Sequence, residues 1–264
     1  MHGILFDSLF VVIQVLCVTS IAVFVTTMYL HRTLTHVSIR IISKRFESFF
    51  CKPAVWITTG INRPEWVAVH RKHHTFTDAE GDPHSPHILG FWKVQLFNVY
   101  YYIREAKTPG VVETFAPDIS PWWGDRTALR GYLGLAIGIS ALMLVGVVFS
   151  LVRGNSAGYG VYLGLLVAAI HAFLYVFVLS PSINGLCHWR GKKPFPDTPG
   201  YNNWLLALLV GGEGDHNNHH QYPRSPKFSI FKGDVDPSWR VIKLLAKAKL
   251  VAIIGKVGVP ESAA

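Results

Sequence analysis

Nine of the thirteen histidines in this chain fall into clusters whose spacing suits metal binding. Residues at positions i, i+3 and i+4 of an α-helix share one face, so an HxxHH motif can direct three imidazole rings toward one point. The chain contains two such motifs, one looser pair and one single histidine. The nine residues are His31 and His36; His70, His73 and His74; His188; and His216, His219 and His220. We therefore expect each HxxHH motif to provide half of a metal site.

The first pair has a different spacing from the other clusters. His31 and His36 are five residues apart, and on a regular α-helix this separates their side chains by about 140°. We expect them to serve different metals or to lie at the end of a helix. Imidazole suits iron, zinc and copper, and nine such ligands are more than one ion accepts. The sequence therefore predicts two metal ions.

Four histidines lie outside these clusters. His2, His84 and His87 show no cluster geometry, and we expect an ordinary structural or surface role for each. His171 falls inside an apolar stretch, where a polar side chain needs an internal partner. A hydrogen bond to a neighbouring helix is the favoured role for His171, and a place in a substrate tunnel is the alternative.

The sequence does not favour a carboxylate-rich metal site. A ferritin-like di-iron centre needs two ExxH pairs and two further glutamates on four helices. This chain offers only Glu213 with His216. We interpret Glu213 and Asp215 as groups that orient ligand rings or tune the metals, with solvated turn residues as the open alternative.

Three apolar stretches can carry these clusters to a membrane surface. Half of the residues are hydrophobic, 13% are aromatic and only 16% are charged, which is unusual for a soluble domain. Roughly 20 apolar residues in a helix cross a bilayer, and residues 8–30, 131–152 and 158–181 reach that length. The nine histidines all lie at or beyond one end of these spans. They can therefore meet at one membrane–water boundary.

The chain is expected to be an all-α integral membrane protein with a single domain, residues 1–264. Its net charge of +9 is concentrated outside the spans, and basic segments stay on the cytosolic side of a membrane. Residues 31–130 and 182–259 are therefore expected to form a cytosolic helical cap that carries the metals. The membrane would be a bacterial-type inner membrane or the endoplasmic reticulum.

Two further helices are expected at the membrane surface or in the cap. Residues 46–61 are apolar but short and interrupted, which predicts an interfacial or re-entrant helix. A full crossing there would separate the first histidine pair from the other clusters. Residues 75–130 should form loops around short interfacial helices, and residues 238–250 a final amphipathic helix.

At this point the motifs resemble the membrane fatty acid desaturase family, specifically the delta-9 type that acts on acyl-CoA or acyl lipids. The segments that carry the resemblance are HRTLTH at 31–36, EWVAVHRKHH at 65–74, DPHSP at 82–86, NGLCH at 184–188, GEGDHNNHH at 212–220 and YPRS at 222–225. Three features depart from the family pattern: one span instead of two before the first motif, Val37 in place of a basic residue, and Asp215 in place of an aromatic one. None of them removes a histidine.

The resemblance implies a histidine-ligated di-iron centre. Its ligands would be the nine clustered histidines, and Asn184 would complete the shell through a water molecule. Asn184 and His188 are four residues apart and would share a helix face. No catalytic residue separate from the metal centre and no organic cofactor are expected.

The implied activity is that of an oxidoreductase that introduces a cis double bond, at the delta-9 position, into a saturated acyl chain. The chain would be carried by CoA, acyl carrier protein or a lipid, and O2 would be the co-substrate. No histidine follows His220, so bis-histidine haem is not expected in that part of the chain. A separate ferredoxin or cytochrome b5 type donor would supply two electrons, and no nucleic acid is expected as a partner. Arg71, Lys72 and Arg224 would hold an anionic head group or merely provide cytosolic charge.

Two alternatives belong to other functional classes. A fatty acyl or lipid hydroxylase could use the same scaffold, although the order and spacing of the motifs favour a desaturase. A membrane metal carrier should hold its ligands near the bilayer midplane, where only His171 would lie. A haem carrier needs histidines that face each other from separate spans, whereas the clustered histidines lie outside the spans. The carrier class is therefore the least favoured.

Overall fold

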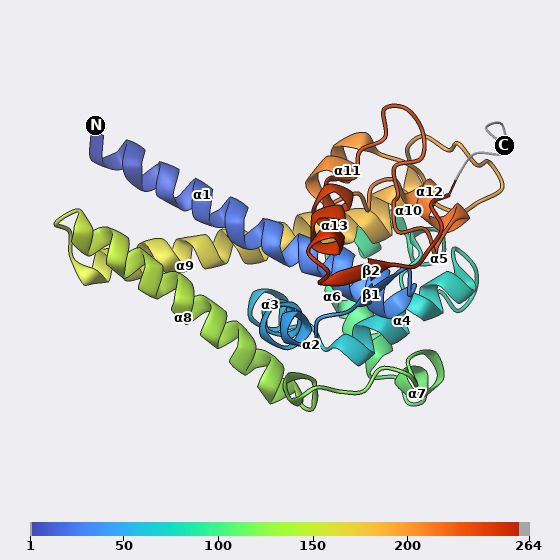
Figure 1. The fold of residues 1–264 in the computed structure, drawn as a ribbon, viewed down its shortest axis with the longest axis horizontal. Coiled ribbons are helices and arrows are strands. Elements are labelled where there is room, and N and C mark those ends of the chain that lie inside the picture. The colour runs from blue at the N-terminus through green and yellow to red at the C-terminus, as the bar shows by residue number, and fades with distance from the viewer. Residues whose placement is uncertain (1, 259–264) are drawn as a thin grey trace.

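Three long helices extend to one side of a compact helical cap, and the second and third of them meet at the end far from it (Figure 1). The structure is a computed structural model that describes residues 2–258, with side chains described from residue 5 onward, so the side chain of His2 lies outside it. The helices long and apolar enough to cross a membrane are Leu5–Thr35, Ala128–Val152 and Ala157–Trp189. They confirm the three predicted spans.

The first and third spans continue beyond the predicted ends. Helix α1 (His2–Val25) passes directly into the π-helix η1 (Thr26–Thr35). Helix α9 (Ala157–Phe173) likewise continues through π-helical η4 (Leu174–Leu179) and η5 (Ser182–Leu186) to α10 (Cys187–Trp189). Sequence polarity marks where a helix leaves the apolar region, and it does not mark where its backbone hydrogen bonds stop. Both spans thus carry clustered histidines at their own ends, His31 on the first and His188 on the third.

The second span, α8 (Ala128–Val152), packs closely against α9. A Cβ atom added to Gly160 would lie 2.4 Å from the Cα atom of Val147, and one added to Gly164 would lie 2.4 Å from the Cα atom of Met143. Glycine at these positions lets the two backbones approach each other. Close packing of the two backbones therefore stabilises the α8–α9 hairpin.

The segment predicted to lie at the membrane surface forms a wedge between the spans. It contains α2 (Lys44–Phe46), π-helical η2 (Glu47–Cys51) and α3 (Lys52–Thr59), and α3 contacts both α1 and α8. The segment turns back at Gly60, which adopts a left-handed conformation with φ of 65°. This geometry agrees with the predicted re-entrant helix.

His171 holds this wedge in place. Its Nδ1 atom lies 3.0 Å from the hydroxyl oxygen of Thr19 on α1, and its Nε2 atom lies 2.9 Å from the carbonyl oxygen of Thr58 on α3. The predicted hydrogen bond from His171 to a neighbouring helix is therefore confirmed. It joins three elements where an unpaired polar group would be costly.

The cap contains the remaining helices and one short β-ribbon. The ribbon pairs β1 (Ile39–Ile41) with β2 (Val251–Ile253) in antiparallel register, and the sequence reading missed it. The amphipathic helix predicted near the end of the chain is present as α13 (Pro237–Lys247). The helices not yet named are α4 (Arg63–Phe76), α5 (Pro86–Leu89), α6 (Phe91–Ala106), α7 (Val111–Phe115), η3 (Trp123–Asp125), α11 (Trp204–Leu209) and α12 (His216–Gln221).

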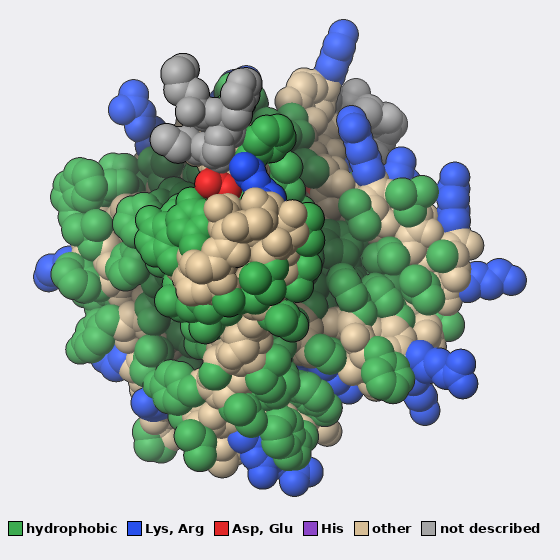
Figure 2. All heavy atoms as spheres, turned by 90° about the vertical axis from the view of Figure 1, so that its left-hand side faces the viewer, with side chains coloured by type: hydrophobic (Ala, Val, Ile, Leu, Met, Phe, Trp, Pro, Cys, Tyr) green, Lys and Arg blue, Asp and Glu red, His purple; other side chains and the backbone are tan. Residues whose placement is uncertain are grey.

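The surface separates apolar and basic side chains. Seen from the left-hand side of Figure 1, hydrophobic side chains cover most of the near face, and Lys and Arg side chains project mainly at its periphery (Figure 2). Several large apolar residues on the spans are solvent-exposed in the isolated chain, including Leu129 at 78% and Val152 at 83%. Such a surface suits lipid as its solvent.

Candidate metal centre

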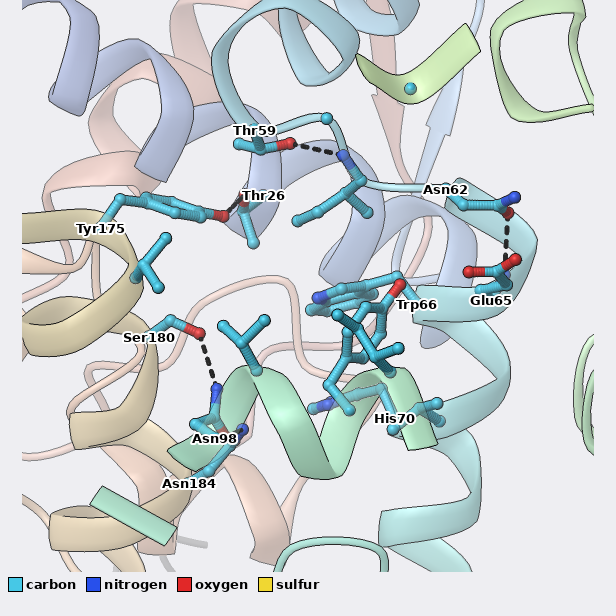
Figure 3. A pocket seen from close by; sticks show the side chains of 18 of the residues that line it. Thr26, Thr59, Asn62, Glu65, Trp66, His70, Asn98, Tyr175, Ser180 and Asn184 are labelled. Atoms are coloured by element: carbon cyan, nitrogen blue, oxygen red, sulfur yellow. Dashed lines mark hydrogen bonds between the residues drawn. The ribbon is translucent and has the colours of Figure 1, made fainter. Parts of the chain in front are cut away.

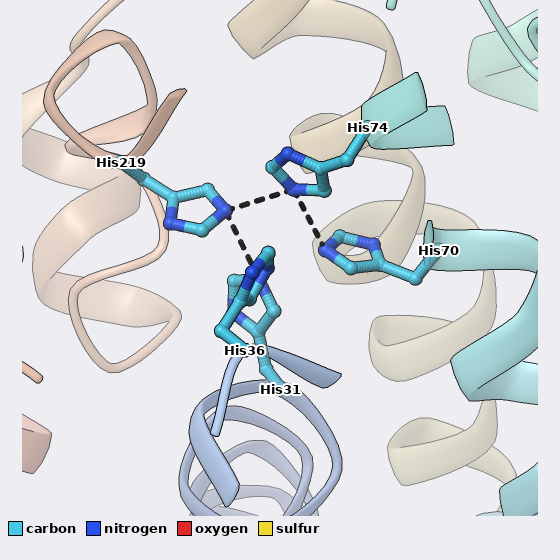
Figure 4. Close-up of side chains that lie close together, drawn as sticks. All are labelled: His31, His36, His70, His74 and His219. Atoms are coloured by element: carbon cyan, nitrogen blue, oxygen red, sulfur yellow. Dashed lines mark hydrogen bonds between the residues drawn. The ribbon is translucent and has the colours of Figure 1, made fainter. Parts of the chain in front are cut away.

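The nine clustered histidines form two adjacent groups. Within each group the nearest ring nitrogens all lie within 4.8 Å of one another. The five-histidine cluster contains His31, His36, His70, His74 and His219 (Figure 4), and the four-histidine cluster contains His73, His188, His216 and His220. The structure therefore offers two ligand sets.

Each HxxHH motif contributes to both clusters, which differs from the expectation that one motif serves one site. On α4, His70 and His74 face the five-histidine cluster and His73 faces the other. On α12, His216 and His220 face the four-histidine cluster and His219 faces the other. Positions i and i+4 are about 40° apart around a helix, whereas i+3 and i+4 are about 100° apart. The middle histidine of each motif therefore reaches the second group.

A π-helix brings the first pair together. The backbone N–H of His36 donates to the carbonyl of His31 over 3.0 Å, an i→i+5 bond. The hydroxyls of Thr33 and Thr35 reinforce this winding by donating to the carbonyls of Met28 and Leu30, also five residues earlier. In a π-helix, residues five apart stack above one another. His36 lies at a helix end, which is the second of the two predicted alternatives, and both histidines join the same cluster.

The ring nitrogens in both clusters are arranged for a cation. In the four-histidine cluster, Nδ1 of His188 lies 2.9 Å from the carboxylate of Asp78, and Nδ1 of His216 lies 3.2 Å from the carbonyl of Glu213. Each Nδ1 therefore carries the proton that is donated, and each Nε2 is left to offer its lone pair to a metal. These two Nε2 atoms face each other at 2.9 Å. Two lone pairs at this distance repel unless a positive ion lies beside them.

The spacing in the five-histidine cluster also fits a metal. Nε2–Nε2 distances are 3.1 Å for His31–His219, 3.1 Å for His31–His36, 3.1 Å for His70–His74 and 3.0 Å for His74–His219. With metal–nitrogen bonds of about 2.1 Å, ligands at right angles would be about 3.0 Å apart. The residues present therefore fit transition-metal ions, as required of a site built from imidazole.

Burial keeps the clustered rings ready to bind metal. Burial, followed by the proximity of the other imidazoles, lowers the pKa of these rings well below the ordinary value for histidine. The histidines concerned are His36, His70, His73, His74, His216, His219 and His220. Neutral imidazole is the form that ligates metals. The site is therefore poised for metal at neutral pH.

Buried carboxylates orient several of the rings. Glu213 accepts a hydrogen bond from Nδ1 of His31 at 2.8 Å and another from the hydroxyl of Thr27. Asp82 accepts from Nδ1 of His73 at 2.9 Å. The predicted orienting role is confirmed for Glu213. Asp215 makes no such contact with an imidazole among the described residues, and burial beside other carboxylates raises its pKa to about 8.

The loop after α4 supplies two carboxylates that sequence reading did not assign. Asp82 also accepts from the backbone N–H groups of Asp78 and His84 at 2.8 and 3.0 Å. Asp78, with φ of 57°, binds both His188 and the hydroxyl of Ser85. The signal was the DPHSP segment itself, whose aspartate and serine favour tight turns. Through the hydrogen bond between Asp78 and His188, this loop links the end of α4 to the end of the third span.

Three asparagines fix the short helix α12. The side-chain oxygen of Asn202 accepts from the backbone N–H groups of Asn217 and Asn218, at 2.9 and 3.2 Å. The amide of Asn217 in turn donates to three backbone carbonyls, and that of Asn218 donates to the carbonyl of Phe228 and to Asp234. A six-residue helix is too short to be stable alone. These bonds hold its three histidines in place, and a lone Asn202 gave no sequence signal.

The two histidines with expected ordinary roles lie close to the centre. His84 is buried, stacks against His73 at a centroid distance of 4.6 Å and groups with His73 and Asp82. Its position differs from that of a surface residue. His87 supports the centre through its Nε2 atom, which lies 2.7 Å from the carbonyl oxygen of His188. That contact is an ordinary structural role, as expected.

An apolar cavity of about 410 Å³ reaches the five-histidine cluster. His31 and His70 line it, and Trp66 lies beside His70 in its wall (Figure 3). On the opposite side, the hydroxyls of Thr26 and Tyr175 form a 2.7 Å hydrogen bond between the first and third spans. The cavity is therefore a space in which a flexible apolar molecule would pass the metal cluster.

Asn184 lines the same cavity but contacts no histidine among the described hydrogen bonds. Its amide donates to the side-chain oxygen of Asn98 at 2.8 Å, and the amide of Asn98 donates to the hydroxyl of Ser180 at 3.2 Å (Figure 3). The position on the cavity wall leaves its assignment to the metal shell as a prediction.

The sequence that forms these spans and histidine clusters is similar to those of known proteins. The model of the fatty acid desaturase family matches residues 8–229. The chain belongs to this family. An Acyl-CoA C20 Delta5-desaturase of Anemone leveillei is 34% identical over 228 residues, which cover 84% of this chain and 66% of the relative. Delta-9 acyl-lipid desaturase 1 of Arabidopsis thaliana is 32% identical over 227 residues, which cover 83% of this chain and 67% of the relative.

Other family relatives carry different positional names. A chloroplastic palmitoyl-monogalactosyldiacylglycerol delta-7 desaturase of Arabidopsis thaliana is 28% identical over 223 residues, covering 83% of this chain and 55% of the relative. The chain spans 66% and 64% of the length of the two Anemone leveillei relatives. The relatives thus share the family and differ in the position that their names give.

Two of the three cations expected to hold a head group, Arg71 and Lys72, take part in ion pairs in this desaturase-family chain, and the role of Arg224 stays a prediction. A guanidinium nitrogen of Arg71 lies 3.0 Å from a carboxylate oxygen of Asp118, and Lys72 lies 2.5 Å from Glu105. The cation that lines the cavity is Lys107 on the segment after α6. Sequence position alone did not single out Lys107, because it lies far from the histidine motifs.

Proposed function

We propose that this chain is a fatty acyl desaturase that introduces a cis double bond, at the delta-9 position, into a saturated acyl chain. The observation that carries the proposal is the apolar cavity lined by His31 and His70, beside two histidine clusters with converging ring nitrogens. A redox-active metal must act on an unactivated methylene, and zinc has no redox chemistry. Iron is therefore the metal proposed for both clusters.

When bound, two iron ions would supply the redox chemistry that uses O2, two electrons and two protons to convert two neighbouring CH2 groups into CH=CH, with release of two water molecules. The protein's own residues would position and protect this reaction. The apolar cavity wall would hold one segment of the acyl chain beside His31 and His70 and exclude water. Glu213, Asp82 and Asp78 would keep the rings in the metal-binding tautomer. Asn184 would complete the ligand shell through water.

A separate electron donor of the ferredoxin or cytochrome b5 type would deliver electrons one at a time. The basic cap supports this proposal, because a positive surface attracts an acidic carrier. The same distribution of charge supports placement of the metal centre on the cytosolic side. Acyl-CoA, acyl carrier protein and lipid are all compatible with the chemistry at the metals.

Expression in a host that cannot make unsaturated fatty acids tests the proposal. Total fatty acids would be measured by mass spectrometry, and iron would be measured in the purified protein. The expected result is a new cis-monounsaturated acid and two iron ions per chain. The variant His219→Ala should lose the product, whereas His2→Ala, which removes a histidine outside the nine, should retain it.

Two other results would change the proposal. A hydroxy acid in place of the alkene would identify a hydroxylase on the same scaffold. Folded, iron-loaded protein that yields neither product with ferredoxin or cytochrome b5 would refute the desaturase function. A protein that binds no iron despite intact folding would refute the di-iron assignment.

A further inference from the structure

We propose that the acyl chain belongs to a membrane phospholipid and enters the cavity sideways, through an opening between α6 and α8. This inference rests on the proposed desaturase function and specifies its substrate class. The opening, here called the α6–α8 portal, is formed by residues that line the cavity and also face outward. They are Val99, Ile103 and Lys107 on and after α6, and Ala128 and Tyr132 on α8.

The exposure of these side chains identifies the portal. Val99 is 36% exposed, Ile103 is 43% exposed and Tyr132 is 69% exposed, although all three line the cavity. By contrast, Leu179 and Val210, which line the same cavity elsewhere, are only 9% and 4% exposed. The cavity therefore meets the surface where α6 and α8 face each other.

The packing of the two helices explains why a gap persists there. Helix α8 packs mainly against α9 and α3, while α6 packs mainly against α4, α5 and the η4–η5 segment. At Gly60, α3 closely approaches α8, because an added Cβ would lie 2.8 Å from the side chain of Leu135. This contact closes one side of the cavity. The portal thus lies between two helices whose main packing partners are different.

The surroundings of the portal are apolar, as expected at a bilayer. Helix α6, which is kinked at Phe97, exposes large side chains along its length, among them Trp92, Leu96, Tyr100 and Ile103. Such an exposed apolar surface suits a helix that lies in the membrane interface. Helix α8 begins at Ala128 and is itself a membrane-length helix. The portal therefore opens at the level where a span begins.

This setting favours a chain that is already in the bilayer. A lipid acyl chain would pass from an apolar environment into an apolar cavity without crossing water. Lys107 at the portal rim, together with Arg104 and Arg126 nearby in sequence, could pair with the phosphate of the lipid. The phosphates of CoA share that chemistry, so charge alone does not distinguish the two carriers. The membrane-facing position of the portal is what favours the phospholipid.

The decisive experiment gives both carriers to the same enzyme. Full-length, iron-loaded protein would be reconstituted in dioleoylphosphatidylcholine vesicles that contain phosphatidylglycerol with deuterated stearoyl chains. Stearoyl-CoA labelled with 13C would be added in the water phase, together with ferredoxin or cytochrome b5 and its reductase. Mass spectrometry would follow the two labels separately. We expect the deuterated chain to be desaturated at least about tenfold faster than the 13C chain.

A pair of neighbouring substitutions tests the route. Ala128→Trp fills the portal, whereas Leu129→Trp places the same side chain one residue away, at a position that is 78% exposed and does not line the cavity. Desaturation of the lipid should fall at least about tenfold in the first variant and stay within about twofold in the second, since only the first obstructs the cavity. Iron content and melting temperature would show that both variants are folded.

The outcomes separate the substrate proposal from the proposed function. Faster desaturation of the CoA label, or full lipid desaturation by Ala128→Trp, would overturn the phospholipid proposal and leave the desaturase function intact. If neither label reacts, the desaturase function fails. In that case a phosphatidylcholine with a diazirine in its acyl chain still tests the portal: crosslinks in the cavity that disappear only in Ala128→Trp support the route, and equal crosslinks in both variants refute it.

Discussion

Substitution of Asp82 should weaken one metal site and spare the other. Its carboxylate accepts three hydrogen bonds, from Nδ1 of His73 and from the backbone N–H groups of Asp78 and His84, and it is only 7% exposed. In Asp82→Asn, one oxygen is replaced by an NH2 group that cannot accept a hydrogen bond. If the NH2 group takes the place of the oxygen that His73 bonds, His73 loses its acceptor, and if the amide oxygen stays there, His73 loses the charge of the carboxylate that fixes its tautomer. Of the two large clusters, only the four-histidine cluster contains His73.

The magnitude follows from the role of such partners at metal sites. Loss of a carboxylate that orients a ligating histidine costs about 10- to 100-fold in metal affinity, or about 1.4 to 2.7 kcal/mol. We expect that loss at the four-histidine cluster and less than about threefold at the five-histidine cluster, since no Asp82 hydrogen bond reaches its rings. Titration of metal-free protein with Co²⁺, followed by its ligand-field absorption, would resolve two binding steps.

The control for this experiment is Asp118→Asn. It makes the same chemical change at an exposed carboxylate that pairs with Arg71. Both binding steps should match those of the unsubstituted chain. Equal weakening of both steps in Asp82→Asn, or no weakening of either, would refute the idea that Asp82 acts through His73. A global loss of folding would show itself in the melting temperature.

Three further predictions concern stability and the cavity. The clustered histidines have lowered pKa values, so the native metal-free chain binds fewer protons than the unfolded chain at acidic pH. Its free energy of unfolding should therefore fall by about 1.4 kcal/mol in total between pH 7.5 and 5.5 for each ring that stays neutral, nearly all of it below the unfolded-state pKa of about 6.5. Thermal melts in detergent would contradict this if stability were constant or rose on acidification. Gly164→Leu should separate α8 from α9, because a Cβ there would lie 2.4 Å from Met143, and should lower the melting temperature far more than Gly158→Leu, where the nearest atom is 4.0 Å away. Thr26→Trp should fill the cavity near Tyr175 and shift the fatty acid products toward shorter chains, and an unchanged chain-length profile would show that Thr26 does not limit the cavity.

The sequence was sufficient to predict the elements governed by composition. Three stretches long enough to cross a bilayer, a short re-entrant segment and an amphipathic final helix all follow from hydrophobic periodicity and length. The role of His171 also followed, since a polar group in a span needs a partner inside the protein. Six of the nine clustered histidines could be named from the spacing of the HxxHH motifs, and His31, His36 and His188 from their position at or beyond the ends of the spans.

Other features depend on geometry that residue types do not specify. The spacing of His31 and His36 predicts whether their side chains meet only if the helix type is known. The residue pattern did not predict a π-helix. The division of each HxxHH motif between two clusters depends on where the opposing helix lies. Asp78 and Asn202 act through bonds to residues more than ten positions away in the sequence. Their roles arise from tertiary structure and were therefore missed.

The division of each HxxHH motif makes the two ligand sets mechanically inseparable. Helices α4 and α12 each supply histidines to both clusters. A rotation of either helix that brings its histidines closer to one cluster therefore moves its histidine in the other cluster as well. A substitution that reorients either helix should therefore disturb both ligand sets, whereas one that acts on a single ring, as Asp82→Asn does on His73, should disturb only one.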